Sequence, residues 1–276
     1  MTAQIDTASG KNRSTENFPV GSFLIRADLR PHVHALYNFA RAADDISDHP
    51  LLEAEDKIAR LDQFAVTLLG KDDLVPSAVA LRQSLKKSGV SPQHALDLLT
   101  AFKRDATQLR YRDWNDLIDY CNYSAAPVGR HVLALHSIGN ETWKANDALC
   151  NALQIINHIQ DCTDDYAQLN RVYIPQDMMA KNGADITDLS NEQSTPALRA
   201  TLSDMLALLD PMLTKAREFP ALVPERRLKA EVAVICALAE NLVALLRKRD
   251  PLCDNVKLGK ISILGATFAG IARVWL

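Results

Sequence analysis

The stretch that decides the fold reads ALYNFARAADDISD, at residues 35–48. Its apolar residues recur every three or four positions, which is the period of an α-helix with one buried face. Tyr37, Arg41, Asp44 and Asp48 follow the same rhythm and therefore share one stripe of that helix. The two outer carboxylates lie one turn apart, where like charges destabilise an isolated helix by about 0.2–0.5 kcal/mol. An acidic pair inside an apolar stretch therefore indicates a bound cation.

A second acidic cluster, NHIQDCTDDY at residues 157–166, repeats this arrangement. Asn157, Asp161 and Asp165 recur at intervals of four residues, so an amide and two carboxylates share a helical stripe. Oxygen ligands of this kind suit Mg²⁺, which retains water and takes one or two protein carboxylates together with phosphate oxygens. The two clusters predict a site for Mg²⁺ and a diphosphate with two acidic walls. We expect them to face each other across the cavity of a helical bundle.

Each of these features also has a simpler interpretation. The first cluster is also consistent with a solvated helix face that carries an ion pair between Arg41 and Asp45. Downstream of the second cluster, Arg171 and Tyr173 are either phosphate-binding groups or a surface arginine and a half-buried tyrosine. The histidines are interpreted as structural or solvent-facing, because His158 and Cys162 alone do not complete a zinc site.

Composition narrows the class of protein. The 276 residues carry a net charge of −3, so no basic field indicates a nucleic-acid partner. Glycine and proline are sparse, which favours helices. The five cysteines are odd in number and form no CxxC motif, so we expect a reduced, cytoplasmic setting. No apolar run approaches the ~18–20 residues that span a bilayer.

Helical periodicity runs along almost the whole chain and predicts an all-α protein. Residues 1–15 are polar and are expected to form a disordered tail, followed by a single domain over 16–276. We expect helices near residues 31–48, 52–69, 75–88, 92–110, 113–139, 145–168, 193–217, 222–249 and 257–274. The last of these either packs onto the core or contacts a membrane surface. Pro127 and Gly129 should kink or break the helix in which they occur, and this kink is interpreted as cavity-lining.

Taken together, these motifs resemble the squalene/phytoene synthases, the family of head-to-head isoprenoid synthases. The resemblance extends from Glu16 to the C-terminus and includes both acidic motifs, YSAAPVG at 123–129 and RVYIP at 171–175. ENFPV at 16–20 and the alanine at 126 resemble the bacterial hydroxysqualene branch of hopanoid biosynthesis. Gln160 stands where phytoene and presqualene diphosphate synthases usually have arginine, which points to a step after prenyl coupling.

The resemblance implies a helical isoprenoid synthase fold with a central cavity. The implied reaction converts presqualene diphosphate and water to hydroxysqualene and diphosphate, with Mg²⁺ as cofactor and no nicotinamide. Carried over by position, the Mg²⁺ ligands would be Asp44, Asp48, Asn157, Asp161 and Asp165. The residues that would bind the diphosphate or lie beside it are Arg41, Arg171, Tyr37 and Tyr173, with Asn17 and Ser22 at the mouth of the site.

Apolar side chains are expected to exclude bulk water from the carbocation, and one positioned water is expected to end the reaction. The expected wall residues are Phe18, Leu36, Phe39, Val128, Leu133, Ile156 and Ile159. Candidates for positioning the water are Tyr123, Ser124 and Gln160. Because substrate and product are both lipids, we expect transient contact with the inner face of the cell membrane and a functional link to other enzymes of the squalene pathway. The chain is expected to be a monomer or a homodimer.

Other functions remain open at the level of sequence. Within the family, the chain is alternatively a presqualene diphosphate, squalene or phytoene synthase. Outside it, the acidic stripes also suit a non-catalytic helical binding protein. A metal-dependent phosphohydrolase would typically use histidine and aspartate ligands together, and no histidine shares the acidic stripes.

Overall fold

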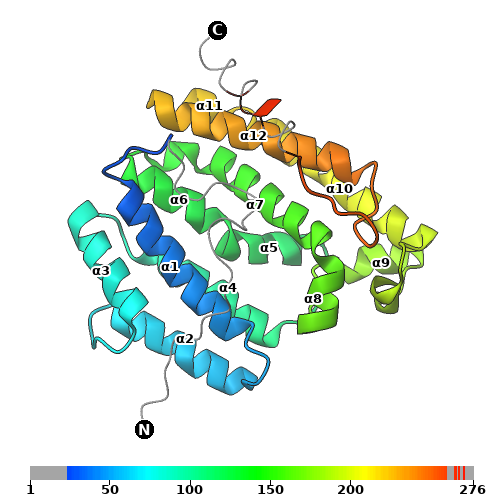
Figure 1. The fold of residues 1–276 in the computed structure, drawn as a ribbon, viewed down its shortest axis with the longest axis horizontal. Helices are drawn as coiled ribbons and strands as arrows, with labels where there is room; N and C mark the ends of the chain where they lie inside the picture. The colour runs from blue at the N-terminus through cyan, green and yellow to red at the C-terminus, as the bar shows by residue number, and fades with distance from the viewer. Residues whose placement is uncertain (1–23, 260–263, 266, 268–269, 271–276) are drawn as a thin grey trace. The chain divides into compact units, whose positions relative to one another are not determined.

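The computed structural model describes residues 24–259, 264–265, 267 and 270 (Figure 1). Helices dominate this part of the chain, and its β geometry is limited to an isolated parallel bridge between Arg110 and Val172. The all-α prediction is therefore confirmed. In chain order the helices of the described residues are α1 (Arg30–Ser47), α2 (Ala54–Leu68), α3 (Pro76–Ser88), α4 (Gln93–Thr107), α5 (Trp114–Ser124), α6 (Ala126–Leu135), η1 (Asn140–Thr142), α7 (Trp143–Gln160), α8 (Cys162–Leu169), α9 (Gln176–Asn182), η2 (Ile186–Ser190), α10 (Pro196–Ala216), α11 (Phe219–Leu222) and α12 (Arg226–Leu246).

Local sequence explains where several of these helices begin and end. The Thr195 hydroxyl accepts a hydrogen bond from the Leu198 N–H, so it caps α10, whose first residue is Pro196. The Glu225 carboxylate caps α12 in the same way. Gly89 and Gly183 close α3 and α9 at a φ of +73° each, a left-handed conformation that glycine adopts without a Cβ clash.

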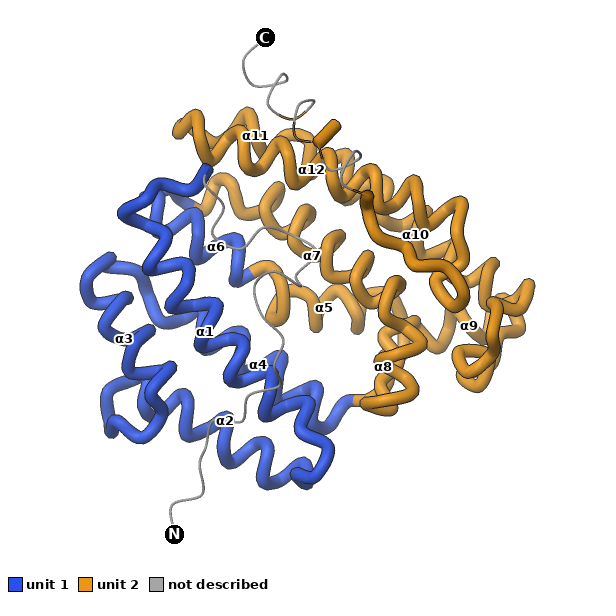
Figure 2. The backbone as a smooth tube through the Cα atoms, viewed as in Figure 1, with its two compact units in different colours: residues 1–108, 127–139 blue, residues 109–126, 140–276 orange. Residues whose placement is uncertain are grey.

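The contacts divide the chain into two compact units (Figure 2). Unit 1 comprises residues 1–108 and 127–139, and unit 2 comprises residues 109–126 and 140–276. Each unit therefore combines two separate stretches of sequence. A single domain over 16–276 stays a prediction, and the predicted tail at 1–15 lies outside the described residues.

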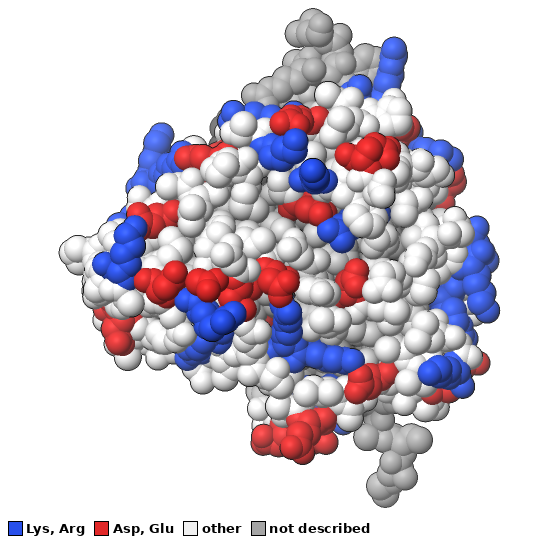
Figure 3. Space-filling model, turned by 180° about the vertical axis from the view of Figure 1, so that it is seen from behind, with Lys and Arg blue, Asp and Glu red and all other residues white. Residues whose placement is uncertain are grey.

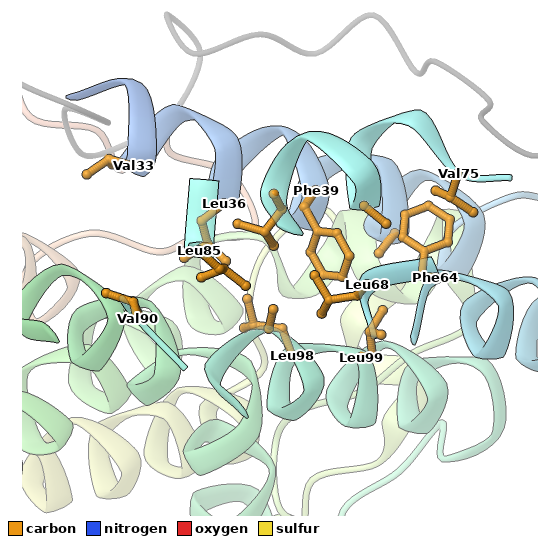
Figure 4. Close-up of a cluster of buried hydrophobic side chains, with 14 of the residues drawn as sticks. Val33, Leu36, Phe39, Phe64, Leu68, Val75, Leu85, Val90, Leu98 and Leu99 are labelled. Carbon is orange, nitrogen blue, oxygen red and sulfur yellow. The ribbon is translucent and has the colours of Figure 1, made fainter. Parts of the chain in front are cut away.

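Unit 1 has its own hydrophobic core, shown in Figure 4. Helix α1 packs against α2, α3 and α4, and its apolar stripe supplies Leu36, Phe39 and Ile46 to the core. The Phe39 ring meets the Phe64 ring edge to face, with ring centroids 5.5 Å apart. Burial of this stripe leaves the opposite side of α1 to the polar residues of the first acidic motif.

Unit 2 is organised around α7, which packs against α5, α10 and α12. Its apolar residues, including Ile155, Ile156 and Ile159, are fully buried in these contacts. The second acidic motif begins on the last turn of α7 and continues into α8. A packed core therefore holds the start of this motif in place.

Three of the predicted helices differ from those observed. The helix expected over 113–139 is interrupted at Ala125 (φ −121°, ψ −50°), two residues before the proline that was expected to break it. Pro127 instead lies in the first turn of α6, where its missing N–H has no helical acceptor to reach. The helix expected over 145–168 is interrupted at Asp161, and the one expected over 222–249 is preceded by the separate helix α11.

Surface charge and helix length are relevant to the nucleic-acid and membrane partners considered above. On the face that Figure 3 shows, acidic and basic side chains are intermixed. None of the helices in the described part of the chain combines the length and the apolar character that a bilayer crossing requires. Most of the predicted C-terminal helix lies outside the described residues, but Leu264, Gly265, Thr267 and Gly270 are helical.

Candidate active site

The first acidic motif occupies the C-terminal end of α1 in unit 1. A backbone hydrogen bond of 2.9 Å from the Asp48 N–H to the Asp44 carbonyl holds these two residues one turn apart. Arg41 pairs with both neighbouring carboxylates, at 2.9 Å from Asp44 and 2.8 Å from Asp45. The ion pair between Arg41 and Asp45 is therefore present. The same guanidinium also contacts the predicted metal ligand Asp44.

The position of these carboxylates on α1 is electrostatically unfavourable. The carbonyl end of a helix carries partial negative charge and normally attracts cations. The last turn of α1 contains no basic residue, whereas it contains Asp44 and Asp45, and Asp48 caps it. Arg41 compensates part of this charge from one turn earlier. A divalent cation at Asp44 and Asp48 would add further positive charge at this helix end.

The second motif lies where α7 passes into α8 in unit 2. The backbone turns at Asp161 (φ −101°, ψ 9°), yet helical hydrogen bonds continue through the turn. The Asp161 N–H donates to the Asn157 carbonyl at 2.9 Å, and the Asp165 N–H donates to the Asp161 carbonyl at 2.8 Å. The predicted four-residue stripe of Asn157, Asp161 and Asp165 is therefore kept, although two helices supply it.

Asp161 is the carboxylate whose ionisation the protein perturbs here. Desolvation by the surrounding protein raises its pKa, and the negative charge of Asp165 raises it further. The charges of His158 and Lys257 act in the opposite direction. The residue nevertheless remains exposed to solvent. A cation bound between Asp161 and Asp165 would relieve their repulsion.

His158 contacts the second motif, which sequence reasoning missed. Its Nδ1 lies 3.7 Å from Oδ2 of Asp165, and its Nε2 lies 3.1 Å from the Gln154 amide nitrogen. Nδ1 is therefore the ring nitrogen that faces Asp165. The expectation that no histidine shares the acidic stripes is therefore wrong. Burial raises the pKa of Cys162 to about 12, so its thiol stays protonated.

A cluster of buried aromatic side chains packs against His158. The Tyr173 ring stacks on His158 with ring centroids 3.6 Å apart and an interplanar angle of 16°. Tyr111 and Tyr120 complete the cluster, each with its ring centroid 5.4 Å from that of Tyr173. All four residues are buried. Tyr173, expected near the diphosphate, thus fixes the imidazole that faces Asp165.

The segments before α5 and after α8 lie side by side and hold this cluster together. The Val172 N–H donates to the Leu109 carbonyl and the Gln176 N–H to the Tyr111 carbonyl, each at 2.9 Å. The Arg110 guanidinium binds Asn170, which ends α8 in a left-handed conformation. Arg110 and Tyr111 belong to no recognisable sequence motif. Only the tertiary structure reveals that they contact Asn170 and Tyr173.

Arg171, the predicted diphosphate ligand, directly follows Asn170 at the end of α8. Its backbone N–H donates to the Asp165 carbonyl at 3.0 Å, which ties it to the acidic motif. The residue is only 5% exposed, so the simpler interpretation of a surface arginine is wrong. Tyr173 is equally buried rather than half-buried.

The turn between α5 and α6 carries three further predicted residues. Tyr123 and Ser124 are partly buried on the last turn of α5 in unit 2, and Val128 is 43% exposed on α6 in unit 1. The Ser124 hydroxyl oxygen is enclosed and has no hydrogen-bond partner within the described residues. It is therefore available to a water molecule or ligand.

The remaining predicted residues are buried, already hydrogen-bonded or outside the described part of the chain. Asn17, Phe18 and Ser22 lie outside the described residues. Phe39 is fully buried in the core of unit 1 with its ring against Phe64, and its role in substrate binding stays a prediction. The other predicted wall residues are also buried in the cores of their own units: Leu36, Leu133, Ile156 and Ile159. The Gln160 amide nitrogen donates to the Val256 carbonyl, so part of its hydrogen-bonding capacity is already used.

The donor sets fit Mg²⁺ better than a transition metal. Within the described residues, no three histidine, cysteine, aspartate or glutamate side chains form a ready metal cage. Mg²⁺ needs only one or two carboxylates, since water and substrate phosphates fill its other positions. Each acidic motif offers one such pair of carboxylates.

The fold and these motifs define an isoprenoid synthase, and comparison with known proteins identifies its family. The squalene/phytoene synthase model matches residues 11–262, and the chain belongs to this family. A solved squalene synthase HpnC from Alicyclobacillus acidocaldarius superimposes with a TM-score of 0.75 at 31% identity, over 86% of this chain and 90% of that one. The chain is accordingly an enzyme of prenyl diphosphate chemistry.

Particular relatives narrow the class further. The chain is 45% identical to a hydroxysqualene synthase of Rhodopseudomonas palustris, over 99% of this chain and 93% of the relative. It is 44% identical to a hydroxysqualene synthase of Zymomonas mobilis, over 96% and 90% of the two chains. Identity to a phytoene synthase of Mycobacterium tuberculosis is 26%, over 98% of this chain and 89% of that one.

Proposed function

We propose that this enzyme is a hydroxysqualene synthase, which converts presqualene diphosphate and water to hydroxysqualene and diphosphate. The observation that carries the proposal is the difference in identity between two kinds of relative. Hydroxysqualene synthases match at 44–45% over nearly the whole chain, whereas a phytoene synthase matches at 26%.

The acidic residues are proposed to hold the cofactor. Asp44 and Asp48 form one pair of oxygen donors, and Asp161 and Asp165 form another, with Asn157 on the second stripe. Each pair brings two carboxylates within one helical turn, which favours a divalent cation at each. When bound, Mg²⁺ stabilises the negative charge that develops on the departing diphosphate.

Two arginines are proposed to bind the diphosphate. Arg41 is held at the first motif by Asp44 and Asp45, with a guanidinium that suits bidentate phosphate contacts. Arg171 follows the second motif, and its backbone bond to Asp165 sets its position. His158 and the tyrosines beneath it keep the Asp165 carboxylate in one orientation.

The chemistry then consists of ionisation, rearrangement and capture. The C–O bond to diphosphate breaks with both electrons leaving on oxygen, and the resulting cyclopropylcarbinyl cation rearranges in an apolar environment. A water molecule adds to the rearranged cation and loses a proton, which yields the alcohol. The enclosed Ser124 hydroxyl, which has no partner within the described residues, is the residue we propose to orient this water.

Product analysis tests the proposal directly. Purified enzyme would be incubated with presqualene diphosphate and, in parallel, with farnesyl diphosphate, each with and without Mg²⁺ and NADPH. We expect hydroxysqualene from presqualene diphosphate, dependent on Mg²⁺ and independent of NADPH. Turnover of farnesyl diphosphate in the absence of a partner enzyme would contradict the proposal.

A squalene synthase is the second candidate, because the solved relative at 31% identity bears that name. Such an enzyme ends the reaction with hydride rather than water. The same incubation separates the two functions, since squalene formed only with NADPH would identify the second. Mass spectrometry distinguishes the products by the additional oxygen atom.

A further inference from the structure

Gln160 is bound to a segment almost a hundred residues away in the sequence. It is the last residue of α7, directly before Asp161, and its amide nitrogen donates a hydrogen bond to the Val256 carbonyl. Val256 is itself buried, with 5% of its surface exposed. The contact therefore attaches the segment after α12 to the second acidic motif, within unit 2.

The segment that Gln160 holds is also anchored to residues that follow α12 and precede α10. The Arg249 guanidinium donates to the Asn255 carbonyl at 3.2 Å, and the Lys257 N–H donates to the same carbonyl at 3.0 Å. Further back, the Asp250 carboxylate accepts from the N–H of Ser194 at 2.8 Å and from its hydroxyl at 2.6 Å. Several hydrogen bonds thus hold residues 250–257 in place.

The two bonded residues each precede a charged one. Asp161 follows Gln160, and Lys257 follows Val256, so the Gln160 bond brings a carboxylate and an ammonium into the same neighbourhood. The positive charge of Lys257 acts to lower the pKa of Asp161, which agrees with this proximity. The Lys257 side chain is exposed, and within residues 24–259 it makes no ion pair.

We propose that Lys257 is an anion-binding residue of the second motif and that Gln160 is the positioning residue that places it there. An exposed ammonium beside a carboxylate pair that holds Mg²⁺ would contact an oxygen of the diphosphate. Gln160 acts through the Val256 segment rather than by touching the substrate. The inference rests on the proposed function only in assuming that the bound anion is a diphosphate.

Binding of inorganic diphosphate tests this without reference to the product. Calorimetric titration of the full-length enzyme in Mg²⁺ would compare wild type with Lys257→Met, Lys257→Arg and Gln160→Leu. We expect Lys257→Met to weaken diphosphate binding about 10-fold, on the scale of one charge-assisted hydrogen bond. Lys257→Arg should stay within about 3-fold of wild type, because it keeps the charge.

A double variant and a control complete the design. If Gln160 acts through Lys257, then Gln160→Leu should weaken binding and the double variant should be no worse than Lys257→Met alone. Lys248→Met is the matched control, since Lys248 lines the same hollow on unit 2 as Lys257 but is not attached to α7. Melting curves followed by circular dichroism confirm that each variant is folded.

Several outcomes would overturn the inference. Equal losses of diphosphate affinity in Lys257→Met and Lys248→Met would indicate a general field of positive charge. Additive losses of affinity in the double variant would show that Gln160 does not act through Lys257. Unchanged diphosphate binding in Lys257→Met would exclude the contact. Each of these results is distinguishable from failure of the proposed function, which would appear instead as the absence of hydroxysqualene from the wild-type enzyme.

Discussion

The Nδ1 atom of His158 lies 3.7 Å from Oδ2 of Asp165, and the same imidazole stacks on Tyr173. The ring therefore lies beside a proposed Mg²⁺ ligand, where it can orient that carboxylate. Groups that orient metal ligands typically contribute about 10–100-fold to metal affinity or activity.

Replacing His158 should change the Mg²⁺ dependence of the enzyme. We expect His158→Phe, which keeps an aromatic ring against Tyr173, to raise the Mg²⁺ concentration for half-maximal activity about 10-fold or more. His158→Asn should restore part of the loss, because its amide N–H takes the place of Nδ1. Titration of activity with Mg²⁺ measures both effects. Equal behaviour of the two variants would show that the imidazole acts only by packing.

Neutralising Asp161 should separate activity from stability. We expect Asp161→Asn to lower activity about 10²-fold or more, on the scale of one key electrostatic stabiliser. Without Mg²⁺ its melting temperature should rise or stay unchanged, since the repulsion with Asp165 is removed. Asp164→Asn, an exposed acid in the same motif, is the matched control and should stay near wild type. A loss of stability in Asp161→Asn would contradict the charge argument.

Acid should destabilise unit 1 through His131. Burial, followed by the charges of His94 and His32, lowers the pKa of His131 from its usual 6.5 to about 4. The unfolded chain therefore binds a proton that the folded protein does not, between about pH 6.5 and pH 4. Its stabilising contribution is fully present above pH 6.5 and is lost as the pH falls through this window, on the order of 3 kcal/mol.

Chemical denaturation between pH 7 and pH 4 measures this effect. His131→Leu should flatten the pH dependence of the free energy of unfolding, because the titrating group is gone. His49→Gln, in the turn after α1, serves as the control and should retain the wild-type slope. An unchanged slope in His131→Leu would assign the pH dependence to other groups.

Gly270 should be sensitive to the addition of a single methyl group. A Cβ built there would lie 2.7 Å from the backbone Cα and N of Val234 on α12, and backbone atoms cannot move aside. We expect Gly270→Ala to reduce the free energy of unfolding by about 1–3 kcal/mol, as overpacking does. Gly265→Ala is the control: it has open space around it and should be neutral or stabilising. Thermal denaturation of the two variants checks the difference.

Much of the fold was predictable because apolar periodicity reports which face of each helix is buried. The helix over 31–48 and the break between the helices expected over 113–139 and 145–168 were both predicted, and they appear as α1 and as the segment between α6 and α7. The interruption at Asp161 was not predictable from that pattern, since helical hydrogen bonds and the four-residue spacing continue through it. The pattern also did not distinguish Phe39 as a core residue from Phe39 as a wall of a cavity.

By itself, the sequence determined the all-α class, the family and the pairing of carboxylates one helical turn apart, since local spacing and residue type decide each of these. The tertiary structure alone decided which side chains support the carboxylates. His158 and Asp165 are seven residues apart, about 10.5 Å along a straight helix, and the turn at Asp161 brings them together. Gln160 and Val256 are joined across 96 positions. Such contacts depend on the direction in which the chain leaves each helix, and local sequence patterns do not encode that direction.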